Sequence, residues 1–77
     1  MSRLYDRLLN SKYELLHYYG LYAFSFEEKN GDWGKQFTVS KYGKKYVIDG
    51  FEGTRNVIKA FKVEIGTLKE VYIYLGI

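Results

Sequence analysis

The sequence contains no cysteine, no proline and a single histidine among its 77 residues. The absence of cysteine excludes disulfides, a thiolate nucleophile and zinc–thiolate sites, and it fits a reducing compartment. His17 alone cannot build a metal cage, so we expect neither a metal nor a cofactor. No apolar run approaches the roughly 20 residues of a membrane span, and the N-terminal segment lacks the apolar core of a signal peptide. We therefore expect a cytoplasmic protein that does not engage a membrane.

The chain is instead rich in apolar and aromatic side chains. Hydrophobic residues make up 47% of it and aromatic residues 19%, which is far from the composition of a disordered chain. No Ser/Gly-rich linker and no internal repeat divides the sequence, so residues 1–77 are expected to form a single domain. A domain this short buries only about 60% of the surface that its unfolded chain exposes, so its stability must come from aromatic packing.

The net charge of +3 is a mild excess, which supports only weak attraction to nucleic acid or acidic surfaces. The distribution of charge says more. Three acidic residues lie near one expected turn and three lysines near the next: Glu27, Glu28 and Asp32, then Lys41, Lys44 and Lys45. Two successive antiparallel hairpins would place these groups at opposite ends of a sheet, so we expect a dipolar surface.

The first segment, residues 3–19, is predicted to be one helix. Its apolar side chains recur at helical spacing, as shown by Leu4, Leu8, Leu15 and Tyr19. The alternative is a break into two short helices, because Ser11 and Glu14 have the Ser-x-x-Glu spacing of a capping box. Either way, an N-terminal helix is expected to pack on the sheet that follows.

From Leu21 the apolar period changes to two, which predicts strands over 21–28 and 35–41. Asn30 and Gly31 are the pair preferred in a two-residue type I′ turn. That turn would set Phe24 opposite Phe37 and Tyr22 opposite Val39, which collects the apolar residues on one face. The pattern indicates an antiparallel sheet that is covered on one side only.

A second hairpin around Tyr42 and Gly43 would add a strand over 45–49. Val39 then faces Tyr46, which assigns the Tyr46 ring to the core face and leaves Tyr42 at the tip. Tyrosine is a poor residue for the positive φ of a primed turn, so the alternative is a longer loop in which Gly43 takes the left-handed position.

The last third of the chain is predicted as a helix over 54–65 followed by a strand over 69–75. The helix is favoured by apolar residues on one side and Arg55, Lys59 and Lys62 on the other. The alternative is a hairpin turning at Gly66 and Thr67, because residues 61–65 also alternate as a strand does. The C-terminal strand is apolar on both faces, so it would be central or paired across a homodimer.

The predicted fold is therefore α+β. An N-terminal helix packs on an antiparallel β-meander (21–28, 35–41, 45–49), with a second helix (54–65) and a C-terminal strand (69–75).

The sequence lacks the patterns of catalytic sites. Glu27 and Glu28 are neighbours in an expected strand, so they point to opposite faces and cannot easily act as an acid/base pair. No nucleophile elbow, phosphate-binding loop or metal-ligand spacing is present. We do not expect an enzyme.

The better candidates are binding residues. Lysines on the second turn can neutralise phosphates or acidic groups, and the Tyr42 ring can stack. Trp33, beside the first turn, is either a lid on the core or an interface anchor. The full set of candidates is Trp33, Lys35, Lys41, Tyr42, Lys44, Lys45, Arg55, Lys59 and Lys62.

Nine tyrosines are more than a core of this size can supply with buried hydroxyl partners. Tyrosine is rigid and amphipathic, and it is enriched in protein interfaces. Six of them are candidates for a recognition surface or for the edges of a thin core: Tyr5, Tyr13, Tyr18, Tyr42, Tyr72 and Tyr74.

Two family resemblances follow from the order of the predicted elements. Helix, three-stranded meander and helix over residues 3–65 resembles the double-stranded RNA-binding domain, although Gly53-Thr54-Arg55-Asn56 stands where that family has a lysine cluster. The same order, with Lys45-Tyr46-Val47-Ile48-Asp49 leading to Ile58-Lys59-Ala60-Phe61-Lys62, is similar to small phage-encoded anti-CRISPR proteins. This second resemblance implies an inhibitor that blocks a nuclease surface without catalysis, inside the host cell.

We therefore expect a small non-catalytic binding protein, an inhibitor or adaptor of the kind that phages and mobile elements encode. Its partner would be a protein or a protein–nucleic acid complex, such as a host-defence nuclease. The alternative is a nucleic-acid-binding domain that uses the basic, tyrosine-bearing turn.

Overall fold

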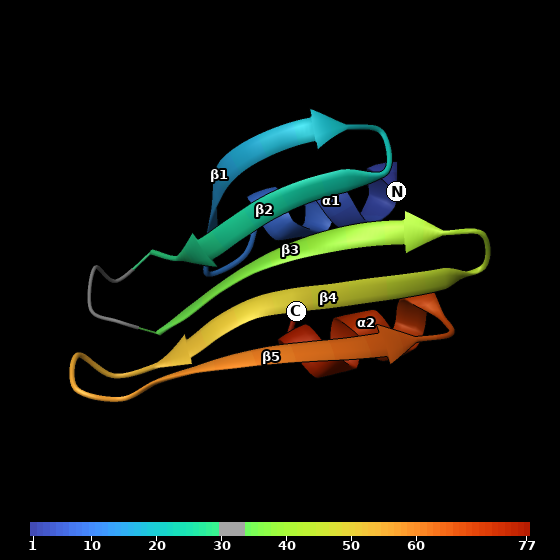
Figure 1. Cartoon of the computed structure of the whole chain (residues 1–77). Helices are drawn as coiled ribbons and strands as arrows, with labels where there is room; N and C mark the ends of the chain where they lie inside the picture. Colours follow the sequence, from blue (N-terminus) through green and yellow to red (C-terminus); the bar gives the residue numbers. More distant parts are fainter. Residues whose placement is uncertain (30–33) are drawn as a thin grey trace.

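The computed structural model describes residues 1–29 and 34–77 and has the α+β fold expected from the sequence. In chain order the elements are α1 (Ser2–Leu9), β1 (Tyr13–Gly20), β2 (Ala23–Glu28), β3 (Lys35–Tyr42), β4 (Lys45–Gly53), β5 (Ile58–Ile65) and α2 (Leu68–Leu75). The strands form one five-stranded antiparallel meander in the order β1-β2-β3-β4-β5 (Figure 1). Neither described helix is long and apolar enough to cross a membrane.

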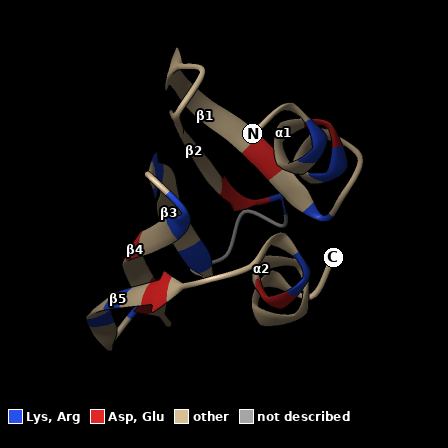
Figure 2. Cartoon of the chain, turned by 90° about the vertical axis from the view of Figure 1, so that its right-hand side faces the viewer, with Lys and Arg blue, Asp and Glu red and all other residues tan. Residues whose placement is uncertain are grey.

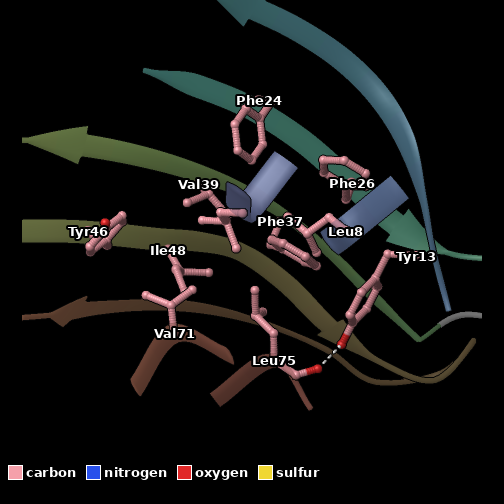
Figure 3. Close-up of a cluster of buried hydrophobic side chains, with 11 residues drawn as sticks. Leu8, Tyr13, Phe24, Phe26, Phe37, Val39, Tyr46, Ile48, Val71 and Leu75 are labelled. Carbon is pink, nitrogen blue, oxygen red and sulfur yellow. Dashed lines mark hydrogen bonds between the residues drawn. The ribbon is translucent and has the colours of Figure 1, made fainter. Parts of the chain in front are cut away.

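Both helices pack on the same face of the sheet (Figure 2). We call this the helix-covered face and the opposite side the open face, which no described element covers. The core lies between the sheet and the helices, and it consists mainly of rings from the central strands and leucines from the helices (Figure 3). Phe24, Phe26 and Phe37 are each no more than 1% exposed. Aromatic side chains therefore make up much of the core, as the amino-acid composition indicates.

The first helix is shorter than predicted. It ends at Leu9, and the Ser11 hydroxyl donates a 2.6 Å hydrogen bond to the Leu8 carbonyl while accepting one of 3.1 Å from the Tyr13 amide. The chain then enters β1, so a helix over 3–19 is wrong beyond Leu9, and so is a second helix after Ser11. Pairing with β2 gives this segment backbone hydrogen bonds along one side, and its aromatic residues suit a strand.

The β2–β3 pairing sorts the faces as predicted but in a different register. Phe24 lies opposite Val39 and Phe26 opposite Phe37, two positions from the predicted partners. A shift of two residues leaves every side chain on its face, so the apolar sorting survives. The predicted turn at Asn30 and Gly31 lies outside the described residues.

The β3–β4 pairing shows the same two-residue shift. Tyr42 pairs with Lys45 and Val39 with Ile48, so the turn consists of Gly43 and Lys44. Gly43 takes the turn position with positive φ, at +59°, which glycine adopts without strain. Tyr42 therefore stays in β3, outside the position that disfavours tyrosine. Tyr46 is 8% exposed and lies on the helix-covered face, which confirms its core assignment.

Residues 54–65 do not form the predicted helix. Strand β4 continues to Gly53, and Thr54 and Val57 exchange backbone hydrogen bonds of 2.8 and 3.3 Å in a tight turn before β5. The alternation of Phe61, Val63 and Ile65 was therefore the correct signal in this segment.

The predicted C-terminal strand is also wrong, because residues 68–75 form α2. The Thr67 hydroxyl accepts a hydrogen bond from the Glu70 amide at 3.2 Å and donates one to the Glu70 carboxylate at 2.9 Å, so Thr67 caps the helix at the Thr-x-x-Glu spacing of a capping box. Gly76 ends the helix in the left-handed conformation, with φ of +70°. Since residues 69–75 are helical, they provide no strand for the expected homodimer contact.

Candidate interaction surface

The basic turn predicted from the sequence lies at one end of the sheet, where it meets the β1–β2 turn (right side of Figure 1). The Lys41 amide donates a 2.9 Å hydrogen bond to the Tyr22 carbonyl, which connects the two turns. We call the group Tyr22, Lys41, Tyr42, Lys44 and Lys45 the basic tyrosine end. It contains residues from two hairpins that are about 20 positions apart in the sequence.

The tyrosine rings of this end face solvent. Tyr22 is 64% exposed and Tyr42 is 68% exposed, and the neighbouring Leu21 is 72% exposed. Their positions explain the exposure, because Leu21 and Tyr22 occupy the turn after β1 and Tyr42 is the last residue of β3 on the open face. Large apolar groups gathered at one exposed place are typical of a contact surface.

The lysines of this end differ in their surroundings. The Lys41 ammonium lies 5.5 Å from the centre of the Tyr46 ring, which is within the range of a cation–π contact. The Lys45 ammonium is 4.0 Å from the Glu64 carboxylate, and both side chains are well exposed. An exposed ion pair of this length contributes little, so Lys45 can be recruited by a partner. Lys44 is exposed within the turn itself.

A shallow hollow of about 300 Å³ extends from this end onto the open face. It is lined by Ser40, Tyr42, Lys45, Val47, Asp49, Lys62 and Glu64. Lys62 stands opposite Asp49 in the β4–β5 ladder. The hollow thus offers both signs of charge and one ring, which suits a polar side chain of a partner better than an apolar ligand.

The remaining candidate residues do not join this surface. Arg55 lies in the turn between β4 and β5, and Lys59 is opposite Glu52 in the ladder, both toward the far end of the sheet. Lys35 lies on the helix-covered face. Its ammonium is 3.7 Å from the Glu52 carboxylate and 5.2 Å from the centre of the Tyr74 ring.

The side chain of Lys35 is only 18% exposed, which indicates a packing role at its position.

Trp33 lies outside the described residues, as does Asp32. Glu27 and Glu28 end β2 at the far end from the basic tyrosine end, so the described part of the expected charge separation is present.

The tyrosines divide between core and surface. Tyr13 was a candidate for the recognition surface, but it is only 2% exposed, so that assignment is wrong. Tyr5 packs edge-on against Phe24 and Phe26, with ring centres 5.2 and 6.1 Å apart, and covers the core from α1. Tyr72 is half-buried on α2. Tyr42 and Tyr22 are the tyrosines of the two turns.

Tyr22 was also assigned wrongly from the sequence, since it was expected opposite Val39 on the core face but is 64% exposed. The available signal was Gly20, which interrupts an aromatic segment just before Leu21. We interpreted Gly20 as the end of a helix, so the hairpin between β1 and β2 was not predicted. Gly20 has φ of +150°, which suits a chain reversal at the end of a strand.

The described residues were also searched for side chains that could form a metal centre. They contain no group of three or more His, Cys, Asp and Glu side chains placed to hold a metal ion. The pKa values of Tyr13 and Tyr74 are raised, chiefly by burial and then by nearby carboxylates, Glu28 and Glu52 respectively. Raised pKa values mean that both phenols hold their protons more tightly than an ordinary tyrosine does.

Comparisons were made with models of protein families, with curated proteins and with solved structures. None of the three gives a match to this chain.

Proposed function

We propose that this chain is a small non-catalytic binding protein that contacts a macromolecular partner through the basic tyrosine end. The observation that carries the proposal is the meeting of two turns at the Lys41–Tyr22 hydrogen bond, which gathers exposed tyrosines and lysines at one end of a sheet. The β3–β4 ladder fixes the backbone of Lys41, Tyr42 and Lys45, so little backbone entropy is lost at these positions when a partner binds.

A protein, or a protein–nucleic acid complex, is the partner that suits this composition best. Tyrosine provides a large amphipathic contact area with few rotatable bonds, and it is enriched at the centres of protein interfaces. The lysines around it favour an acidic surface and would raise the rate of association. We therefore propose an inhibitor or adaptor that covers an acidic surface of its partner, of which a host-defence nuclease is one example.

The test begins with capture of partners from host lysate by the immobilised chain, with and without nuclease treatment. Each captured protein is then purified and its affinity measured by calorimetry. Tyr22→Ala combined with Tyr42→Ala should weaken the binding at least about tenfold, since interface tyrosines commonly contribute more than about 1 kcal/mol each.

Phe51→Ala is the matched control, because Phe51 is an exposed aromatic residue of β4 at the other end of the sheet. It should leave the affinity unchanged. Equal affinity of the double tyrosine variant and the wild type, for every partner captured, would refute this function.

Binding of single-stranded nucleic acid is the second candidate, and the juxtaposition of Lys41, Lys44 and Lys45 with two exposed rings favours it. Rings stack on bases while lysines neutralise phosphates. Titration of a fluorescent oligothymidine at several salt concentrations tests it directly. Lys44→Ala combined with Lys45→Ala should reduce the slope of log affinity against log salt by roughly 0.7 for each phosphate that these lysines no longer neutralise. No binding at low salt would exclude this candidate.

A further inference from the structure

The two edges of the sheet differ in how well they could accept another strand. The β1–β2 pairing has two irregularities, between Leu15 and His17 and between Tyr18 and Gly20. The β4–β5 pairing is regular throughout, from the pair Tyr46 and Ile65 to the pair Gly53 and Ile58. Bulged edges resist pairing with a further strand. Strand β5, with eight regular residues, is therefore the edge that remains open to pairing.

The hydrogen bonds of the β4–β5 turn identify which backbone groups of β5 are free of β4. Thr54 and Val57 exchange both of their backbone hydrogen bonds, so they form a hydrogen-bonded pair. Antiparallel ladders alternate between hydrogen-bonded and non-hydrogen-bonded pairs. Counting along the regular ladder, the amide and carbonyl groups that point outward belong to Ile58, Ala60, Lys62 and Glu64.

The side chains of β5 are incompletely covered on one face, and in the second half of the strand they are charged on the other. Phe61, Val63 and Ile65 pack against the core from the rim of the helix-covered face, but each stays partly exposed. Lys62 and Glu64 are exposed on the open face. An apolar row at a sheet edge gains burial when the sheet is extended.

We propose that a second copy of this chain extends the sheet, with the two β5 strands antiparallel and the two-fold axis at Val63. In this register Lys62 lies opposite Glu64 of the second copy, and the symmetry repeats that pair. On the other face Phe61 lies opposite the second copy's Ile65, and the two Val63 side chains meet at the axis. Opposite charges and apolar groups are thus each placed across from a complementary partner.

Neighbouring registers lack this match. An axis at Lys62 or at Glu64 places two like charges directly opposite each other. An axis at Phe61 places Lys62 opposite Ala60 and Glu64 opposite Ile58. The axis at Val63 also continues a charge row, because Lys62 already stands opposite Asp49 on β4 and would gain a second acidic neighbour. The sequence of β5 therefore selects a second copy and one register.

Sedimentation equilibrium of the full chain tests the dimer, and charge reversal tests the register. Lys62→Glu and Glu64→Lys should each weaken dimerisation by about tenfold or more, because each turns two attractive pairs into repulsive ones. An equimolar mixture of the two variants should recover association as a heterodimer, since the opposite charges then face each other. Arg3→Glu, the control, makes the same change in net charge as Lys62→Glu but on α1, and should leave dimerisation unchanged.

Glu64→Pro gives an independent test, because the outward amide of Glu64 is not needed for the β4–β5 ladder. This variant should keep its circular dichroism spectrum and lose the dimer. Val63→Cys should form a disulfide-linked dimer on mild oxidation, whereas Phe61→Cys should not.

A wild-type chain that sediments as a monomer up to about 1 mM overturns the proposal, even if another protein is found to pair with this edge. A dimer that tolerates both charge reversals, or a mixture of the two variants that stays monomeric, overturns it as well.

Discussion

The hydroxyl of Tyr13 donates a 2.9 Å hydrogen bond to the backbone carbonyl of Leu75, which connects the first residue of β1 to the last residue of α2 (Figure 3). The Tyr13 ring also lies edge-on to Phe37, with ring centres 5.0 Å apart. One buried side chain thus connects a sheet edge, the central strand β3 and the C-terminal helix. Its burial accounts for its raised pKa and for its absence from the interaction surface.

Tyr13→Phe should lower the free energy of unfolding by about 1–2 kcal/mol, because the hydrogen bond is lost and the Leu75 carbonyl is left without that partner. Urea denaturation followed by circular dichroism measures the change. Tyr42→Phe is the matched control, since this hydroxyl is exposed, and it should shift stability by less than about 0.5 kcal/mol. Equal stabilities of the two variants would contradict the role of the hydrogen bond.

The stability should fall at alkaline pH. The pKa of Tyr13 is raised above the ordinary tyrosine value of 10.0, so in this range the folded chain holds the phenol proton more tightly than the unfolded chain does. The stabilisation is fully present below pH 10 and is lost as the pH rises through the folded pKa. Denaturation curves at about pH 8 to 11 test this, and the decline should be shallower in Tyr13→Phe. An identical decline in that variant would show that other groups cause it.

The face of each residue in β2, β3 and the first half of β4 could be predicted from the sequence, whereas the register could not. A period of two fixes which side chains share a face. The exact partner depends on the turn, and Tyr42 and Lys45 pair around Gly43 rather than one position earlier. Both errors were shifts of two residues, which is why Tyr46 was nevertheless placed correctly in the core.

The ends of the chain were predicted less well because local and tertiary preferences differ there. The helical spacing of Leu4 and Leu8 is real, but Leu15 belongs to β1, where pairing with Phe26 overrides the helical pattern. At the C-terminus the sequence does contain the signal of a helix start. Thr67 and Glu70 have the same capping-box spacing as Ser11 and Glu14, and here a helix does follow.

The candidate surface was predicted only in part. The lysine turn was found because its residues are adjacent in sequence. Tyr22 was missed because it reaches the turn through a hairpin that the sequence did not predict. A surface formed by two segments that are distant in sequence depends on the topology of the fold. When one element is predicted wrongly, the residues that this element contributes to the surface are missed.

Gly50→Ala should destabilise the fold by about 2 kcal/mol or more. A Cβ atom at this position would collide with the Gln36 carbonyl and lie 2.7 Å from the Phe37 Cα, both in the backbone of β3. Backbone atoms of a central strand cannot move aside as a flexible side chain can, so the collision is relieved only by distorting the ladder. Gly66→Ala is the matched control, because a Cβ there meets nothing within 4 Å. Similar urea midpoints for the two variants would show that β3 and β4 can separate without cost.

Arg7 connects the two helices, so its loss should lower stability although the residue is exposed. Its guanidinium donates a 2.8 Å hydrogen bond to the Ile77 carbonyl and lies 4.2 Å from the centre of the Tyr72 ring. Arg7→Ala should cost about 1–2 kcal/mol, or a fall in melting temperature of roughly 4–16 °C for a domain of this size. Arg7→Lys keeps the charge but loses the planar stacking group, so its melting temperature should lie between those of Arg7→Ala and the wild type.

Arg3→Ala, on an exposed position of the same helix, serves as the control and should melt within a few degrees of the wild type. Since α1 contacts the sheet through Leu4 and Leu8 in any case, a wild-type melting temperature for Arg7→Ala would mean that these leucines alone hold the helix layer together.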